Sequence, residues 1–495
     1  MSAGLCRFLR FLHPVAHMLY CGALCLCLWP VTVRGQAFSS SNLPILLIDT
    51  RGQSIVDDPK IVASLQIIDH GAGQRNALTD APTFVSPIGI ELRGASSQMF
   101  PKKPYGFEMR DSSGLKQADA ALLGMPSGSD WVLNATYNDK SLIREGLTYD
   151  LYRQMSPYYA PRYRYCELVL NGAYAGIYSL FEKIKRDKNR VNIANLKKTD
   201  VSGNALTGGY ILKIDKTEGS PSRAWNSPYP AADGKTTTLI QIDRPKPEDL
   251  AEAQFQYIKK YVTDAETVLK SEQYRDSTDG YRTYFDANSF VDYLLITEVC
   301  RNVDGYRLSA FFYKDRDGNA GPGKLVMGPI WDYNLTYGNA DYCDGNLSTG
   351  WVYQFANVCS GDPYQLPFWW SRLLSDPAFA GQVRTKYGAL RQTILRTERL
   401  HAYVDSTAQV LTEARIRNFQ RWPVLGVYVW PNGYVGQTYQ QEIDYLKSWI
   451  SQRLLWLDGA MASLSSAVLS ASPGLYFVQL VANGQPVACR KILRQ

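Results

Sequence analysis

Apolar and polar residues alternate in short runs through the first part of the chain, from about residue 43 to residue 215. Early runs are LPILLIDT, ASLQIID, IGIELRG and YGFEMRD, and later ones are YCELVLNG, AYAGIYSLFEKI and GGYILKID. Turn-forming Gly, Pro, Asn and Asp separate them, and this pattern predicts β-strands, with a hairpin turn at Asn171-Gly172. In LIREGLTYDLYRQM the apolar spacing is helical instead, so we expect a helix after Asp139-Lys140-Ser141.

After about Pro247 the apolar spacing is mainly helical. Helices are predicted in EDLAEAQFQYIKKYVTDAETVLK, in FDANSFVDYLLITEVC and between about Pro367 and Leu464. One hairpin interrupts them, formed by LSAFFYKD and KLVMGPIWD around the turn RDGNAGPG. Residues 216–247 are expected to form a long loop with one strand at TTTLIQID. Strands early and helices late predict an α+β fold, with a β-rich lobe over 38–245 and a helical lobe over 246–465.

Residues 1–37 have the pattern of an export signal. Arg7 and Arg10 precede an apolar stretch from about Val15 to Val33, and Gly35-Gln36-Ala37 is a small-x-small cleavage site. We expect an exported chain, with an uncleaved membrane anchor as the alternative, and we find no comparable apolar span further along.

An oxidising compartment makes Cys343 and Cys359 the candidate disulfide pair, and isolated buried thiols are the alternative.

The composition and net charge of the chain limit the kinds of partner that we expect it to bind. Its 495 residues are 45% hydrophobic and 20% charged, which is typical of a globular protein. The net charge is +7, and loss of Arg7, Arg10 and Arg34 with the signal would lower it to +4. Because dense Lys/Arg runs are also missing, we expect no nucleic-acid partner.

The sequence contains only four histidines, and this excludes the commonest hydrolase chemistries. His13 and His17 lie in the predicted signal, His70 lies in a turn-like Asp-His-Gly, and His401 lies in a helical run. Ser-His-Asp hydrolases, Cys-His proteases and His-ligated zinc enzymes all need an imidazole at the reacting centre. CxxC, GxxxxGK[ST] and GxGxxG motifs are also missing. We therefore expect chemistry based on carboxylates, Lys/Arg and a hard metal ion.

Two carboxylates flank the predicted hairpin. Asp304 precedes its first strand and Asp332 follows its second, 28 residues later. Antiparallel pairing brings these two ends together. Oxygen ligands without nearby His or Cys favour Mg²⁺, or otherwise Mn²⁺ or Ca²⁺. The alternative is that both residues only cap turns.

An Asp, a short hairpin and a second Asp also form the metal-binding arrangement of protein kinases. Here the chain resembles the spore-coat-protein-H (CotH) kinase family, atypical secretory-pathway kinases, over most of its length. The matching blocks are RGASSQMFPKKPYGFEMRD (93–111), DWVLNATYNDKSLIREGLTYDLYRQM (130–155), LVLNGAYAGIYSLFEKIKRDKNRV (168–191), GGYILKID (208–215), NVDGYRLSAFFY (302–313), GPIWDYNLTYG (328–338) and LPFWWSRLLSDPAF (366–379).

The resemblance implies a two-lobed protein-kinase-like fold that binds ATP with Mg²⁺ and phosphorylates Ser/Thr of a protein in the envelope or outside the cell. Asp304 would take the catalytic-loop position, acting on the hydroxyl or touching a metal, and Asp332 would be the principal metal ligand.

Five further residues would support the nucleotide. Lys103 is the candidate phosphate-pairing lysine, and Lys102 is its close alternative. Glu182 would orient that lysine. Arg93 and Arg144 would support the site, or alternatively form salt bridges between lobes.

This chain departs from the family pattern at two positions. Ser309 stands where the family usually has Asn, and Asn334 stands where it usually has Asp. Both retain an oxygen for the metal, but Asn334 removes a charge, and hard cations are held largely by anionic oxygens. A nucleotide-binding envelope-assembly protein with weak or absent transfer is therefore a second hypothesis.

A carbohydrate-binding protein is a third hypothesis, because many Trp and Tyr residues offer rings for sugar stacking. Most of the tryptophans lie in helical runs, where core packing is the favoured interpretation. They include Trp351, Trp369, Trp370, Trp422 and Trp430.

The C-terminal residues 466–495 are predicted to form a small β unit with a turn at Asn483-Gly484. This unit is similar to the end of a type IX secretion sorting domain, which would place the protein outside the outer membrane. The alternative is an extra hairpin packed on the helical lobe.

Overall fold

The structure is a computed structural model that describes residues 38–217, 223–319, 321–464, 474–482 and 485–494. The predicted signal at 1–37 lies outside these residues. Within the described ranges, no helix is long and apolar enough to cross a membrane.

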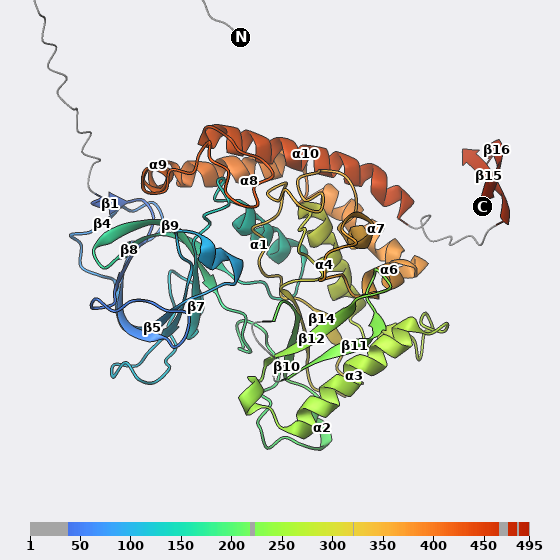
Figure 1. The fold of residues 1–495 in the computed structure, drawn as a ribbon, viewed down its shortest axis with the longest axis horizontal. Helices are drawn as coiled ribbons and strands as arrows, with labels where there is room; N and C mark the ends of the chain where they lie inside the picture. The colour runs from blue at the N-terminus through green and yellow to red at the C-terminus, as the bar shows by residue number, and fades with distance from the viewer. Residues whose placement is uncertain (1–37, 218–222, 320, 465–473, 483–484, 495) are drawn as a thin grey trace, which may run out of the picture. The chain divides into compact units, whose positions relative to one another are not determined.

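Seven strands form a closed barrel (Figure 1), in the order β2-β3-β5-β6-β7-β9-β8. They are β2 (Ile45–Asp49), β3 (Ile61–Ile68), β5 (Phe84–Leu92), β6 (Tyr105–Met109), β7 (Asp130–Asn134), β9 (Ala173–Glu182) and β8 (Tyr163–Leu170). Neighbouring strands are antiparallel except β2 and β8, which pair in parallel. Alternate residues such as Leu46 and Ile48, or Leu65 and Ile67, are buried in one cluster, as period-two strands require.

Five strands form a second sheet, in the order β11-β12-β10-β13-β14. They are β11 (Ala224–Pro230), β12 (Thr237–Arg244), β10 (Tyr210–Ile214), β13 (Ala310–Lys314) and β14 (Leu325–Met327). The predicted β13–β14 hairpin is confirmed. The predicted lobe boundary at residue 245 falls, along the chain, between β12 and β13. Both strands pair with β10, so this boundary does not separate two sheets.

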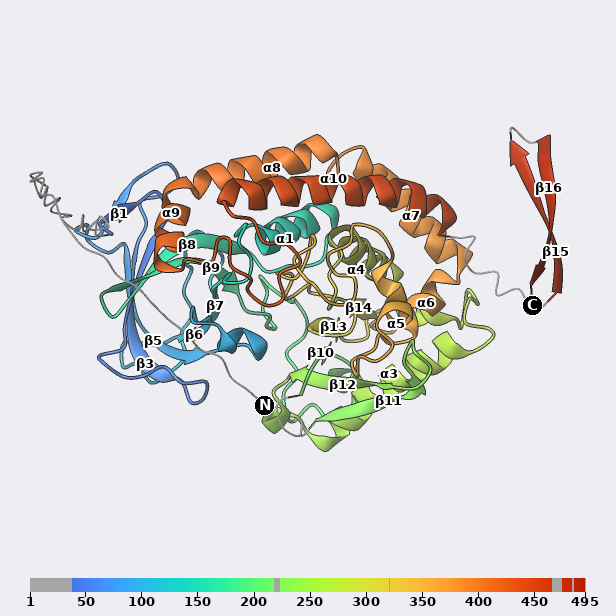
Figure 2. The same ribbon diagram turned by 45° about the horizontal axis from the view of Figure 1, so that its top comes forward.

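Helices make up most of the remaining regular secondary structure. The longer ones are α1 (Arg144–Met155), α3 (Glu252–Lys270), α4 (Ala287–Cys300), α7 (Pro377–Arg391), α8 (Thr397–Val410), α9 (Thr412–Arg421) and α10 (Tyr439–Ser463). Short elements are β1 (Ser40–Ser41), β4 (Asn76–Ala77), α2 (Gly203–Leu206), α5 (Phe355–Val358) and α6 (Trp369–Leu374). Helices α8 and α10 lie side by side (Figures 1 and 2), and α3 packs against β11.

Helix α4 forms the centre of the helical core. Every residue of α4 except Asn288 is buried, and the helix contacts α1, α7, α10 and β14. Its N-cap Asp286 accepts hydrogen bonds from the backbone N–H groups of Asn288 and Ser289. The helix ends at Cys300, where Arg301 takes a left-handed conformation with φ of +50°. This turn directs the chain toward Asp304.

Several smaller predictions are confirmed. The fold is mixed α+β, and Cys343 and Cys359 form a disulfide. His401 lies in helix α8, as predicted, where it donates to a backbone carbonyl, and we also find that His70 pairs with Asp80. The tail forms an antiparallel pair, β15 (Gly474–Ala482) and β16 (Gln485–Arg494), while its predicted turn at 483–484 lies outside the described residues.

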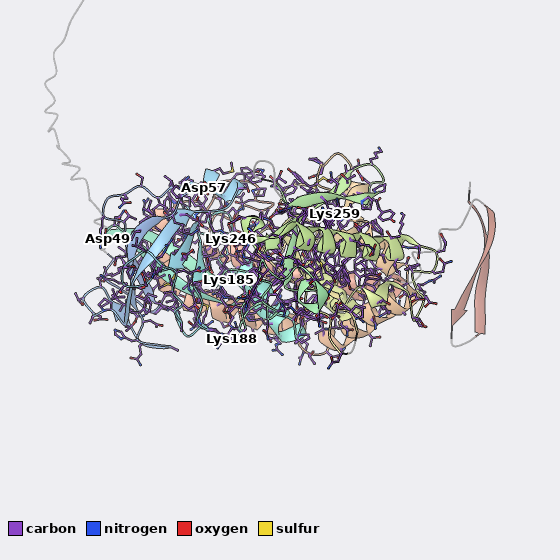
Figure 3. All side chains as sticks on the ribbon, turned by 90° about the horizontal axis from the view of Figure 1, so that it is seen from below. Asp49, Asp57, Lys185, Lys188, Lys246 and Lys259 are labelled. Atoms are coloured by element: carbon purple, nitrogen blue, oxygen red, sulfur yellow. A yellow bond between two sulfur atoms is a disulfide. The ribbon has the colours of Figure 1, made fainter. Side chains whose placement is uncertain are left out.

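The predicted core packing of the tryptophans is confirmed for Trp369 and Trp370, which are fully enclosed in the helical core. Trp351 and Trp422 are half-buried, and Trp430 is exposed, so the prediction is wrong for Trp430. Charges of both signs are spread over the surface. Figure 3 labels Asp49 and Asp57 as well as Lys188 and Lys246, all of them exposed.

Candidate active site

A cavity of about 690 Å³ opens between residues of the barrel, the five-stranded sheet and the segments around the β13–β14 hairpin. Asp304 and Asp332, from the two ends of the hairpin, both line it. Ser309 and Asn334 line it as well. The four residues predicted to bind a metal therefore share one cavity.

Asp332 lies in a strained turn after β14, with a left-handed φ of +65°. Its backbone N–H donates to the Tyr149 hydroxyl at 3.2 Å, and its Oδ2 accepts from the Ser309 hydroxyl at 3.3 Å. The carboxylate is accessible from the cavity, although protein surrounds it on the other sides. This burial raises the pKa of Asp332, and the negative charges of Asp215 and Asp304 add to the rise.

Asp304 lies in the turn between α4 and β13. Its Oδ1 accepts two hydrogen bonds, one from Nη2 of Arg307 at 2.7 Å and one from the Tyr342 hydroxyl at 2.8 Å. Its backbone N–H donates to Oδ1 of Asn302 at 3.2 Å. Asp304 is therefore held by side chains from two separate segments.

Arg93 lines the cavity beside these carboxylates. Its guanidinium lies 5.2 Å from the ring centroid of Trp331, the residue before Asp332. It makes no hydrogen bond or ion pair with the described residues, so its donors are available to an anion. Its positive charge also opposes the rise in the pKa of Asp332.

Glu145 is a cavity residue that the sequence interpretation missed. It lies in the first turn of α1 and is only 6% exposed. Asn134 donates to its Oε2, and the Tyr149 hydroxyl lies 3.4 Å from its Oε1. Burial raises the pKa of Glu145 to about 8, and the charge of Asp332 contributes. The available signal was the four-residue spacing between Glu145 and Tyr149, which places both on one helix face.

The two predicted phosphate lysines are bound to protein atoms. Lys102 lines the cavity, but its ammonium donates to the carbonyl of Ile177 and, at 3.0 Å, to Oδ1 of Asn418. Burial lowers the pKa of Lys102 to about 7. Lys103 does not line the cavity, and its ammonium donates to the Gln98 carbonyl at 2.6 Å.

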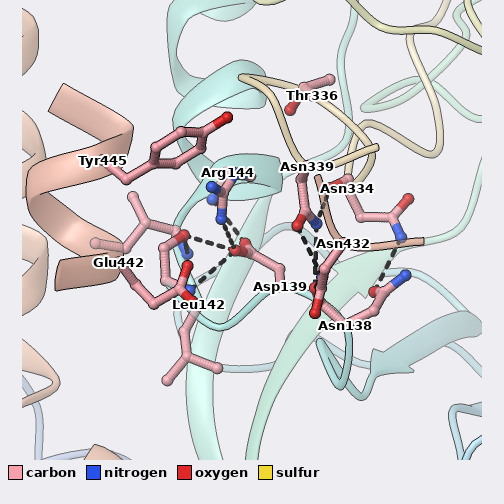
Figure 4. Close-up of polar contacts among 12 residues, drawn as sticks. Asn138, Asp139, Leu142, Arg144, Asn334, Thr336, Asn339, Asn432, Glu442 and Tyr445 are labelled. Carbon is pink, nitrogen blue, oxygen red and sulfur yellow. Dashed lines mark hydrogen bonds and ion pairs between the residues drawn. The ribbon is translucent and has the colours of Figure 1, made fainter. Parts of the chain in front are cut away.

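Glu182 and Arg144 also lie outside the cavity lining. The buried Glu182 carboxylate accepts from Arg162 at 3.0 Å and from the Tyr159 hydroxyl at 3.1 Å. Within the described residues it contacts neither predicted lysine. Buried Arg144 donates to Oδ1 of Asp139 at 2.6 Å (Figure 4), which fixes the start of α1.

An asparagine network holds the segment after Asp332 (Figure 4). The Asn334 amide donates to Oδ1 of Asn138 at 3.4 Å, so the Asn334 side-chain oxygen remains an acceptor. Asn432 donates to the Asn138 carbonyl at 2.6 Å and to Oδ1 of Asn339 at 3.0 Å. These contacts tie the 334–339 segment to the residue before Asp139.

The donor set of this cavity fits a hard cation. Asp304, Asp332, Ser309 and Asn334 offer only oxygen, which suits Mg²⁺ better than a transition metal. Among the described residues there is no cluster of three or more His, Cys, Asp or Glu that would hold a metal by itself. A cation here would therefore need further oxygens from a ligand.

Further cationic side chains, which the sequence interpretation did not single out, also line the cavity. They are Lys183, Lys213, Lys216 and Arg244. Burial lowers the pKa of Lys183, and the positive charges of Arg93 and Arg244 lower it further. A cavity that holds both carboxylates and crowded cations suits an anionic ligand that carries its own metal ion.

Fold and site together define a class of protein: a mixed α+β chain with carboxylates and cations around one polar cavity. The chain belongs to the CotH kinase family, because the family model described as CotH kinase protein matches residues 90–457, most of its length. Family membership indicates a kinase-like function. The comparison with curated proteins finds no match.

Proposed function

We propose that this protein is an exported, two-lobed, protein-kinase-like phosphotransferase that binds ATP with Mg²⁺ and phosphorylates Ser or Thr of a secreted or envelope protein. One observation carries the proposal. Asp304 and Asp332, 28 residues apart, line the same cavity as Arg93, whose guanidinium makes no hydrogen bond or ion pair with the described residues. Carboxylates for a metal and an arginine for phosphate are the recurring parts of phosphoryl-transfer sites.

Asp332, Ser309 and Asn334 would hold the magnesium ion, and Asp304 would lie close to the Ser or Thr hydroxyl that accepts the phosphate. The metal ion would neutralise the charge of the phosphates when bound. Arg93 is a better phosphate ligand than Lys102 or Lys103, because both ammonium groups already donate to protein oxygens.

In the proposed transfer, the acceptor hydroxyl oxygen forms a bond to the γ-phosphorus. The bond from that phosphorus to the bridging oxygen of ADP breaks, and ADP leaves with the electron pair. The hydroxyl proton passes to the Asp304 carboxylate, which is within the same cavity.

A second candidate function is nucleotide binding with slow or absent transfer. It is favoured by the two departures from the family pattern. Ser309 replaces the usual Asn, and Asn334 replaces the usual Asp and so removes a negative charge. The Ser309 hydroxyl is hydrogen-bonded to Asp332, so this change lies at the proposed metal ligand itself.

Calorimetric titration of ATP with and without Mg²⁺ tests the proposal, together with transfer of γ-phosphate to the protein itself or a partner. Asp332→Ala should abolish the Mg²⁺-dependent binding and the transfer. Asp249→Ala is the matched control, because Asp249 is an exposed carboxylate outside the cavity. Normal transfer by Asp332→Ala would overturn the proposal, while binding without transfer under Mg²⁺ and Mn²⁺ would favour the second candidate.

A further inference from the structure

We infer that Tyr342 and Arg307 are positioning residues for Asp304, and that the Cys343–Cys359 disulfide holds both in place. This inference rests on the proposed function, because it explains how the site orients Asp304, the carboxylate that faces the acceptor hydroxyl in the proposed transfer. Under this inference the disulfide supports the candidate site and does more than stabilise a distant loop.

Both positioning residues bind the same oxygen. The Tyr342 hydroxyl and the Arg307 guanidinium each donate to Oδ1 of Asp304, at 2.8 and 2.7 Å. Within the described residues, Oδ2 accepts no hydrogen bond. Two donors on one oxygen fix the rotation of the carboxylate, and they leave Oδ2 as the oxygen for the acceptor hydroxyl or a cation.

Arg307 is itself fixed by a second segment of the chain. Its side chain is 2% exposed, and its Nη1 lies 3.2 Å from Oδ1 of Asp362 and donates to the carbonyl of Tyr364 at 3.1 Å. The guanidinium carbon also lies 4.2 Å from the ring centroid of Phe355. The orientation of Arg307 therefore depends on residues 355–364.

The disulfide connects the segment that carries Tyr342 with the segment that anchors Arg307. Tyr342 directly precedes Cys343, and the carbonyl of Cys359 accepts from the N–H of Asp362 at 3.1 Å and from Gln365 at 2.8 Å. One half of the bridge therefore neighbours Tyr342, and the other half neighbours the anchor of Arg307.

The ring of Tyr342 packs against a residue that lines the cavity. It stacks on Trp430 with an interplanar angle of 4° and a centroid distance of 6.3 Å. Trp430 lines the cavity together with Asp304. A shift of Tyr342 would therefore change the surroundings of the acceptor as well as the orientation of Asp304.

The disulfide loop has other anchors, so loss of the bridge should not unfold it. The buried Glu298 carboxylate accepts from the N–H groups of Val352 and Tyr353, each at 2.9 Å. Arg301 and Arg453 both donate to the carbonyl of Gly350, at 2.6 and 2.7 Å. We therefore expect a local loosening around Asp304 in an otherwise folded protein.

The test compares three variants of the full chain: Tyr342→Phe, the paired change Cys343→Ser with Cys359→Ser, and all three changes together. Each of the first two should lower kcat about tenfold and leave KM for ATP within about twofold. The loss in the combined variant should be smaller than the product of the two separate losses, because Tyr342→Phe removes a contact that the serine pair already loosens. Tyr364→Phe is the control, since the Tyr364 ring is exposed and Arg307 uses only its carbonyl.

Amide hydrogen exchange over residues 301–309 gives a readout that does not depend on transfer. Exchange there should rise in Tyr342→Phe and in the serine pair, and not in Tyr364→Phe. Unchanged exchange, or additive losses of kcat, would overturn the inference even if transfer is found. Raised exchange in a protein without any transfer would support the positioning role and contradict the proposed function alone.

Discussion

The hydroxyl of Tyr149 accepts a hydrogen bond from the backbone N–H of Asp332 at 3.2 Å. The same hydroxyl is the donor to Glu145 at 3.4 Å, so one buried oxygen joins helix α1 to the turn of the proposed metal ligand. Asp332 holds a left-handed φ of +65°, which is unfavourable for a residue with a side chain. We conclude that Tyr149 stabilises the backbone that orients Asp332.

Replacing Tyr149 with Phe should therefore affect both stability and metal binding. The variant leaves the Asp332 N–H without a partner, which should lower the free energy of unfolding by about 1–3 kcal/mol. Mg²⁺-dependent ATP binding should weaken, while ATP binding without metal should not change. Urea unfolding and calorimetry measure the two effects.

Tyr387→Phe provides the control for this change. The Tyr387 hydroxyl donates to Asp458 at 2.8 Å on the α7–α10 side of the molecule, away from the cavity lining. This variant should lose stability without losing Mg²⁺-dependent affinity. Equal affinities in Tyr149→Phe and the original protein would contradict the role assigned to Tyr149.

Restoring the usual residues of the family at two positions should strengthen metal binding. Asn334→Asp adds a negative charge to a set of neutral and anionic oxygens, and hard cations prefer anionic oxygens. We expect the Mg²⁺ concentration needed for ATP binding to fall several-fold, and further with Ser309→Asn. Titration of Mg²⁺ at fixed ATP measures this, and an unchanged Mg²⁺ requirement would indicate that Asn334 does not face the metal.

Arg93 and Lys102 should differ in how their loss affects the protein. Arg93→Gln removes a guanidinium that makes no hydrogen bond or ion pair with the described residues, so ATP affinity should fall by about 1.5–3 kcal/mol while stability changes little. Lys102→Met removes the donor to Ile177 and Asn418, so stability should fall more than affinity. Calorimetry and thermal unfolding of both variants separate the effects. A larger affinity loss in Lys102→Met would restore Lys102 as the phosphate ligand.

Much of the fold follows from local patterns. The alternation of apolar and polar residues identifies barrel strands such as β2 and β3. The hairpin between Asp304 and Asp332 explains why both residues line one cavity. Strand β11 was missed because AWNSPYP contains Asn and two prolines, which are uncommon in strands. The extent of the second sheet was missed because the pairing of β10 with β13 joins residues about a hundred positions apart.

The site was predicted only where local chain geometry determines it. Which partner a charged side chain finds depends on contacts distant in sequence, and no local pattern reports them. Lys102 meets Asn418, 316 residues away, and Arg307 meets Asp362. The spacing between Glu145 and Tyr149 places both on one helix face, but it does not show that the tertiary fold brings Glu145 beside Asp332 in a buried environment.

A second buried carboxyl, Glu266 on α3, lies outside the lining of the candidate site. Its Oε1 accepts from the Ser227 hydroxyl and the indole N–H of Trp369, each at 2.9 Å. Its Oε2 has no partner among the described residues. Burial raises the pKa of Glu266 to about 7, from an ordinary value of 4.5.

Glu266 should therefore make the stability of the protein depend on pH. Between pH 4.5 and 7 the folded protein keeps a proton that the unfolded chain releases, so the free energy of unfolding falls as pH rises. The loss should total about 3 kcal/mol and level off above pH 7. Glu266→Gln cannot ionise and retains the accepting oxygen, so its advantage over the original protein should grow across this range in urea unfolding without divalent cations. The exposed Glu272→Gln should show no such trend, and parallel profiles for Glu266→Gln and the original protein would mean that Glu266 is ionised in the fold.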